Sequence, residues 1–91
     1  MGTIVKFAFR EGDKPEDLEV DMALAIFAAE CVYGRPRVRM EASYLVAKDG
    51  RSCVLQVAGE SGEAAARIFS GLAAVRFGDQ GFHVRREVAP T

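Results

Sequence analysis

Hydrophobic and polar residues alternate along two neighbouring stretches, 38–48 and 51–57, which flank Asp49-Gly50. Alternation with a period of two is typical of β-strands. Asp-Gly between two such runs favours a two-residue type I′ turn, in which both residues have positive φ. Side-chain alternation and turn chemistry therefore predict one hairpin with one register. That register places Lys48 opposite Arg51, Val46 opposite Cys53, Tyr44 opposite Leu55 and Ala42 opposite Val57.

The rest of the chain contains two further strand patterns and two helix patterns. The strand patterns alternate and predict half-buried strands. The helix patterns repeat apolar residues at helical spacing, and Gly34 followed by Pro36 is a typical stop for the first of them. The predicted strands are 3–10 and 82–88, and the predicted helices run from about Pro15 to Tyr33 and from Ser61 to about Gly78.

The start of the first helix has two interpretations. Asp13 and Glu16 have the spacing of a capping box, and Pro15 is tolerated in a first helical turn, so a start near Pro15 is favoured. Alternatively, residues 18–20 continue as extended chain and Asp21 caps a shorter helix.

The order of elements is strand, helix, strand, strand, helix, strand within one domain, residues 1–91, with a short C-terminal tail at 89–91. Two helices on one face of a four-stranded antiparallel sheet form a split βαββαβ α+β fold, the ferredoxin-like arrangement. Its covered sheet face is expected to carry Val5, Phe7, Val38, Met40, Tyr44, Leu55, Val57, Phe82 and Val84.

The first predicted helix is more apolar than a helix packed on one side of a sheet needs to be. Only Glu19, Ala23 and Glu30 form a polar stripe in its body, whereas such a helix normally buries a stripe about 100° wide. We therefore expect a second burial partner, either a dimer mate or another protein, although an alanine-rich helix that is simply exposed would show a similar pattern. The expected contact residues are Met22, Ile26, Phe27 and Tyr33.

Charge is distributed unevenly, although the net charge is only −1. Residues 1–34 contain three basic and seven acidic side chains, whereas residues 35–91 contain nine basic and six acidic ones. Arg37, Arg39 and Arg85 are expected on the uncovered sheet face, which has no aromatic side chain for base stacking, so nucleic-acid binding should be weak at most. For Arg35, Arg37 and Arg39, protection of an edge strand from pairing is favoured over a contact with an anion or an acidic partner. The candidate contacts for an anion, an acidic partner or nucleic acid are Arg35, Arg37, Arg39 and Arg85.

The chain contains no recognisable catalytic or metal-binding constellation. Its two cysteines lack CxxC spacing and are expected to be reduced and buried. Its single histidine, His83, has no nucleophile at a supporting spacing. Asp13, Asp17 and Asp21 would line one helical face, but they lack the loop geometry that calcium sites use. We therefore expect a protein that is not an enzyme and holds no cofactor.

In fold and length the chain resembles the acylphosphatases, but its residues do not match that family. There, an arginine in a glycine-rich loop after the first strand and an asparagine that positions water carry the chemistry. This chain has no asparagine, and its corresponding loop reads Glu11-Gly-Asp-Lys-Pro. The order of elements is also similar to that of small accessory proteins of His-Xaa-Ser peptide-maturation systems, a similarity of layout that assigns no residue a role.

Together these patterns predict a non-enzymatic interaction protein or accessory subunit that forms a homodimer or binds another protein through its first helix. One alternative is a small-molecule-binding regulatory domain. The other is a domain that binds nucleic acid weakly through its arginine-bearing sheet face. Since no signal-peptide pattern and no apolar run of about 20 residues is found, a cytoplasmic location without membrane contact is expected.

Overall fold

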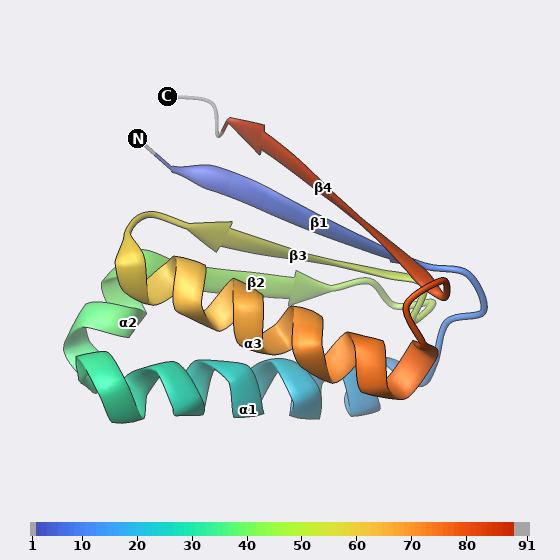
Figure 1. Ribbon diagram of the computed structural model, residues 1–91, viewed down its shortest axis with the longest axis horizontal. Coiled ribbons are helices and arrows are strands. Elements are labelled where there is room, and N and C mark those ends of the chain that lie inside the picture. Colours follow the sequence, from blue (N-terminus) through green and yellow to red (C-terminus); the bar gives the residue numbers. More distant parts are fainter. Residues whose placement is uncertain (1, 89–91) are drawn as a thin grey trace.

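Four antiparallel strands form one sheet, and two long helices pack together against one of its faces (Figure 1). The structure, a computed structural model, describes residues 2–88, so the predicted tail at 89–91 lies outside the described residues. The strand order β2-β3-β1-β4 confirms the predicted ferredoxin-like α+β fold. The elements in chain order are β1 (Thr3–Phe9), α1 (Pro15–Tyr33), α2 (Arg35–Glu41), β2 (Ala42–Val46), β3 (Ser52–Val57), α3 (Glu60–Phe77) and β4 (Phe82–Val88).

The β2–β3 hairpin has the predicted register but not the predicted turn. Tyr44 pairs with Leu55, and the neighbouring pairs follow the same count. However, Asp49 does not have positive φ, so the turn is not type I′. Instead, the Gly50 N–H donates to the carbonyl of Ala47 at 3.0 Å, within the five-residue loop 47–51 that separates the two strands. Loops of this length are most often built around a type I turn, and the predicted Lys48–Arg51 pair is not part of the ladder.

Gly50 is buried because the hairpin loop packs against the segment that follows β1. The Asp13 N–H donates to the Gly50 carbonyl at 3.0 Å. Gly50 has φ +69°, and a Cβ atom there would lie 1.6 Å from the carbonyl oxygen of Asp13. Only glycine fits this position without moving the chain, so the turn residue also positions the loop that leads into α1.

Residues 35–41 form the helix α2, so the prediction of a strand beginning at Val38 was wrong. The alternating pattern of this segment covers few residues, and the same residues are also compatible with a helix. A proline lies in its first turn, where proline is favoured. Arg37 and Glu41 form an i,i+4 ion pair at 3.3 Å. Val38 is buried all the same, but from α2, whereas Met40 is exposed.

The hydrophobic core lies between the two long helices and the central strands β1 and β3. Phe7 of β1 contacts Phe69 of α3 edge to face, with ring centroids 4.8 Å apart. Of the side chains predicted to face the helices, those on β1 and β3 are buried, whereas Tyr44 and Val84 on the edge strands are 42% and 45% exposed. The two helices are therefore too narrow to cover the full width of the sheet. The buried strand residues are Val5, Phe7, Phe9, Cys53, Leu55 and Val57.

The helix α1 begins at Pro15, as favoured, but the predicted capping box does not form. The N-cap is Lys14, and no side chain caps the first turn. Instead, Asp13 accepts a hydrogen bond from the Lys14 N–H at 2.8 Å and one from the Arg76 guanidinium, also at 2.8 Å.

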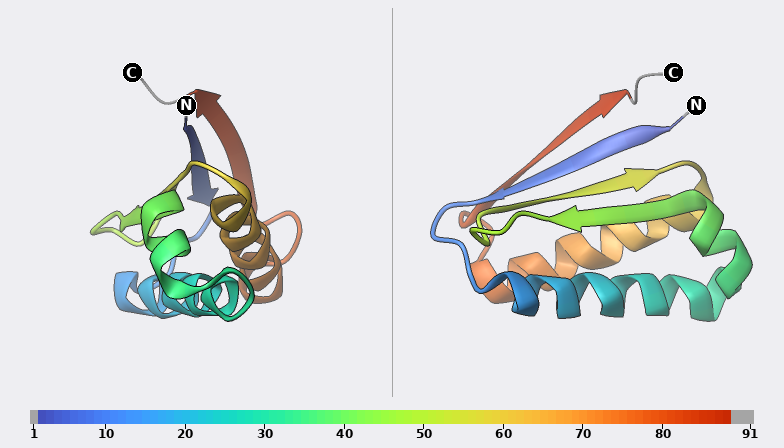
Figure 2. Two further views of the ribbon diagram at one scale, coloured as in Figure 1. Left: turned by 90° about the vertical axis from the view of Figure 1, so that its left-hand side faces the viewer. Right: turned by 180° about the vertical axis from the view of Figure 1, so that it is seen from behind.

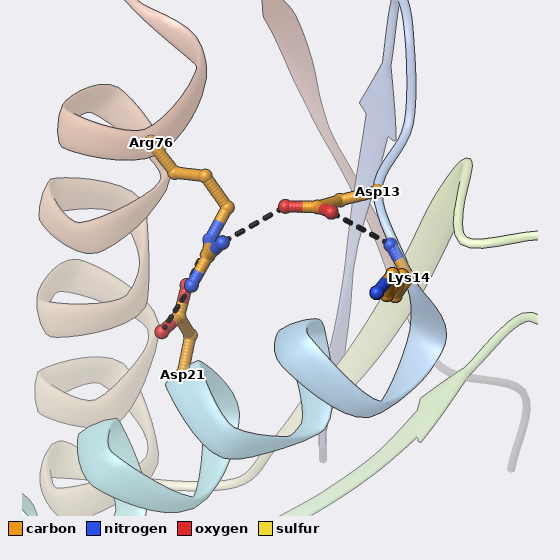
Figure 3. Close-up of polar contacts among 4 residues, drawn as sticks. All are labelled: Asp13, Lys14, Asp21 and Arg76. Carbon is orange, nitrogen blue, oxygen red and sulfur yellow. Dashed lines mark hydrogen bonds and ion pairs between the residues drawn. The ribbon is translucent and has the colours of Figure 1, made fainter.

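Arg76, near the end of α3, binds two carboxylates, that of Asp21 on the neighbouring helix α1 and that of Asp13 in the segment before α1 (Figure 3). Its Nε and Nη2 donate to the two carboxylate oxygens of Asp21 at 2.6 and 3.1 Å, and its Nη1 donates to Asp13. Forked arginine–carboxylate pairs of this kind fix orientation as well as distance. Because Asp21 is almost fully buried on α1, this pair fixes how α1 is rotated against α3.

A second polar contact ties the end of α2 to the start of α3. The Glu41 carboxylate accepts hydrogen bonds from the Ser61 hydroxyl at 2.6 Å and from the Ser61 N–H at 3.1 Å. A carboxylate at the first turn of a helix also favours the positive end of the helix dipole. This contact explains why a seven-residue helix holds its place next to the sheet.

We predict that Arg76→Ala lowers the free energy of unfolding by about 2 kcal/mol, because it leaves the buried Asp21 carboxylate without its charged donor. Urea denaturation of purified protein measures the change. Arg67→Ala is the matched control, since Arg67 lies exposed on the same helix and forms no ion pair with any of residues 2–88. An equal effect of the two substitutions would contradict the role given to Arg76.

Acid should destabilise the protein through two carboxylates. The Lys14 N–H and the Arg76 guanidinium hold the pKa of Asp13 below its usual value, and the Ser61 hydroxyl lowers the pKa of Glu41. A carboxylate with a lowered pKa in the folded state stabilises the fold above the unfolded-state pKa, and this contribution is lost as the pH falls through the folded-state pKa. We therefore predict that stability is constant near neutral pH and falls below about pH 4.5.

The measurement is the urea midpoint between pH 7 and pH 3. Asp13→Asn with Glu41→Gln should be less stable than the wild type at neutral pH but should lose less stability on acidification. A wild type and a double variant with parallel pH profiles would show that other groups cause the acid sensitivity.

Candidate functional site

The helix α1 has apolar side chains on two opposite faces. Its inner face contains Leu18, Met22, Ala25 and Ala29, which are buried against α3 and the sheet. On its outer face, Val20, Leu24 and Phe27 are 57%, 51% and 63% exposed, and Cys31 is also exposed. We call Val20, Leu24, Phe27 and Cys31 the outer stripe.

The members of the outer stripe lie along one line of the helix. They are separated by four, three and four residues, and a helix with about 3.6 residues per turn brings such positions onto one side. In the end-on view of Figure 2, α1 lies on the side of the molecule away from the strands. No other element of residues 2–88 covers these side chains, since each remains exposed in the folded chain.

The structure separates the four predicted contact residues of the first helix. Phe27 belongs to the outer stripe, whereas Met22 is fully buried and is part of the core. Ile26 and Tyr33 are half-buried and pack against the core, and the guanidinium of Arg37 lies 5.1 Å from the centre of the Tyr33 ring. Periodicity alone did not show which apolar face turns inward, and the 4-3-4 spacing was the signal that could have identified Val20, Leu24 and Cys31.

The predicted arginine group is also divided. Arg35, Arg37 and Arg39 lie on α2, so the expectation that the last two share the open sheet face with Arg85 was wrong. Arg85 does lie on β4, where its Nε is 3.2 Å from Glu87. The three arginines of α2 lie directly after the end of α1 and not on the sheet. The sheet face therefore does not carry the continuous basic surface on which nucleic-acid binding was predicted to depend.

Opposite charges flank the two ends of the outer stripe. Glu16 and Glu19 are exposed near the N-terminal end of α1. Arg35 and Arg39 are exposed just beyond its C-terminal end, and neither forms an ion pair with any of residues 2–88. Arg37 is already engaged, since it pairs with Glu41 and lies 3.9 Å from Glu60. Acidic side chains therefore lie near the N-terminal end of the outer stripe, and basic side chains follow its C-terminal end in the chain.

The two cysteines have different environments, although both were expected to be buried. Cys53 is buried under the helices, and burial raises its pKa to about 12, so it is a poor nucleophile. Cys31 is exposed at the C-terminal end of the outer stripe. It therefore supplies a natural chemical probe of this surface.

The described residues contain no group of three metal ligands, and Asp13 and Asp21 are held by Arg76. Among residues 2–88, no helix has the length and apolar character needed to cross a membrane.

A comparison with protein-family models gives no match, and a comparison with curated protein sequences gives none either.

We predict that one thiol per chain reacts quickly with a chromogenic disulfide reagent in dilute solution. The second should react only on unfolding, because Cys53 is buried and its pKa is raised to about 12. Absorbance at neutral pH, with and without denaturant, counts both classes of thiol. Cys31→Ser should remove the fast phase, and a fast phase that persists in this variant would show that the core opens at Cys53.

Proposed function

We propose that this protein is a non-enzymatic interaction module that acts as a homodimer, with the outer stripe of α1 packed antiparallel against the same stripe of a second copy. The observation that carries this proposal is the row of large apolar side chains on the helix face opposite the core. Exposed apolar rows of this kind are typical of interaction sites when they are contiguous and bordered by polar residues.

The spacing of the outer stripe supports a second copy of the chain as the partner. A two-fold axis makes an interface self-complementary. The spacing of the contact residues along an antiparallel helix pair must therefore be the same in both chain directions. The spacing of four, three and four residues has this property. About an axis midway along the stripe, Val20 lies opposite Cys31 of the second copy, and Leu24 lies opposite its Phe27.

The charges at the ends of the stripe support the same arrangement. The axis that pairs Val20 with Cys31 also brings the N-terminal end of α1, which carries the exposed Glu16, next to the C-terminal end of α1 in the second copy, which the exposed Arg35 follows. A parallel arrangement would instead bring acid to acid and base to base, which is unfavourable. Charge therefore selects the antiparallel orientation, and apolar contact supplies most of the attraction.

The expected dimer is weak. Val20, Leu24 and Phe27 are already about half covered, so burying the remainder contributes about 1 kcal/mol for each side chain. Two copies provide six such side chains, or about 6 kcal/mol, against an association cost of at least about 4 kcal/mol. We therefore expect a dimer that dissociates on dilution, as suits an accessory subunit that exchanges partners.

We predict that Phe27→Asp abolishes self-association and leaves the fold intact, because the substitution places a charge in the middle of an interface but lies outside the core. Sedimentation velocity over a hundredfold range of protein concentration measures the monomer–dimer equilibrium. Val75→Asp is the matched control, because Val75 is an 88% exposed apolar residue on the neighbouring helix α3. A wild type that stays monomeric at the highest concentration would contradict the proposal.

Cross-linking tests the orientation within the same experiment series. In the antiparallel dimer, Val20→Cys should form a disulfide with Cys31 of the second copy under mild oxidation. Two Cys31 residues should not react with each other, since they would lie about 16 Å apart along the axis at about 1.5 Å per residue. A rapid Cys31–Cys31 disulfide in the wild-type dimer would show a parallel pair and overturn the assignment.

A further inference from the structure

The open face of the sheet, on the side away from the helices, is hollowed near β1, β3 and β4. The hollow has a volume of about 450 Å³ and is lined by Lys6, Ala8, Ser52, Val54, His83 and Arg85, together with backbone. Its volume lies in the range of small-molecule sites. It is remote from the outer stripe, because the sheet separates the two surfaces (Figure 2).

Strand register explains why the sheet is hollow at this place. Ala8 of β1 pairs with Ser52 of β3 and with His83 of β4, so this row across three strands has small side chains on its two neighbouring strands β1 and β3. In the next row, Lys6 pairs with Val54 and with Arg85. The longer side chains of this second row stand beside the small ones and form a wall.

The wall of the hollow carries excess positive charge. Lys6 Nζ lies 3.2 Å from one carboxylate oxygen of Glu87, and Arg85 Nε lies 3.2 Å from the other. One carboxylate therefore balances two cations. Arg85 approaches Glu87 through Nε, and no hydrogen bond among residues 2–88 uses its terminal nitrogens, which can therefore donate to a ligand anion.

The other side of the hollow continues towards the sheet edge, where apolar side chains lie between the polar Ser43 and Gln56. Val54 is shared with a second, shallow hollow of about 140 Å³, which extends to the exposed Leu45 on β2. Leu45, Val54, Lys6 and Arg85 form one row across the four strands. With strands about 4.8 Å apart, this row spans roughly 14 Å from its cationic end to its apolar end.

We propose that this row binds a small amphiphilic carboxylate, with the carboxylate on Lys6 and Arg85 and a short hydrocarbon body over Ala8, Val54 and Leu45. A single unbalanced cation suits a monoanion better than a phosphate. The apolar half of the row would be left uncovered by an inorganic anion. The site is independent of the proposed dimer, since it uses no residue of α1 or α2.

The test is an NMR titration of the full chain with three probes: octanoate, 1-octanol and acetate. Octanoate has both the anionic and the apolar part, whereas each of the other probes has only one. We expect octanoate to give saturable amide shifts in β1, β3 and β4, with no comparable shifts from either of the others at equal concentration. Equal binding of octanol or of acetate would overturn the proposal, because charge or apolar contact would then contribute nothing.

Two substitutions probe the site from different sides. Arg85→Ala should weaken octanoate binding about tenfold through loss of a charged donor. Ala8→Leu should block binding by filling the hollow. Arg39→Ala and Phe27→Asp are controls that should bind octanoate as the wild type does. Octanoate shifts confined to α1, or wild-type affinity in both test variants, would show that the ligand does not occupy the sheet face.

Discussion

The contact of Arg76 with Asp21 and Asp13 is the constraint on which the useful surfaces of this molecule depend. An apolar helix with two similar faces could pack with either face inward at little difference in buried area. Asp21 lies beside the inner face of α1, and its buried carboxylate reaches the guanidinium of α3 in only one rotation of the helix. The Arg76–Asp21 pair thus determines which of the two apolar faces of α1 packs against the core. Val20, Leu24 and Phe27 consequently remain exposed.

The molecule consequently has two exposed surfaces of different chemistry on opposite sides. The outer stripe of α1 is apolar, with acidic residues at one end and basic residues at the other. The open face of the sheet is mixed, with a cationic wall formed by Lys6 and Arg85 beside an apolar strip. Because the helical layer and the sheet lie between these surfaces, a partner on one leaves the other free. A dimer formed through α1, as proposed, would expose two identical sheet faces outward.

Local patterns predicted most of the fold because they depend on neighbours in sequence. The Tyr44–Leu55 register followed from alternation on both sides of Asp49-Gly50, and the end of α1 followed from Gly34. The helix α2 was missed because seven residues satisfy either periodicity. The choice was made by contacts that are distant in the chain, above all the Glu41 carboxylate on Ser61, twenty residues later. The turn type was also decided at a distance, since Gly50 packs against Asp13.

The sequence by itself determined the order of the four strands and the two long helices, the hairpin register and the surplus of apolar residues on the first helix. These are properties of periodicity and turn chemistry, which act over a few residues. Only the tertiary structure decided which side of α1 is exposed, and so separated Met22 from Phe27. It also moved Arg37 and Arg39 away from Arg85 and aligned Lys6 with Arg85 on the sheet. The physical reason is that the rotation of a helix and the neighbours of a strand are set by contacts between segments far apart in the chain. The local periodicity of the sequence carries no information about these contacts.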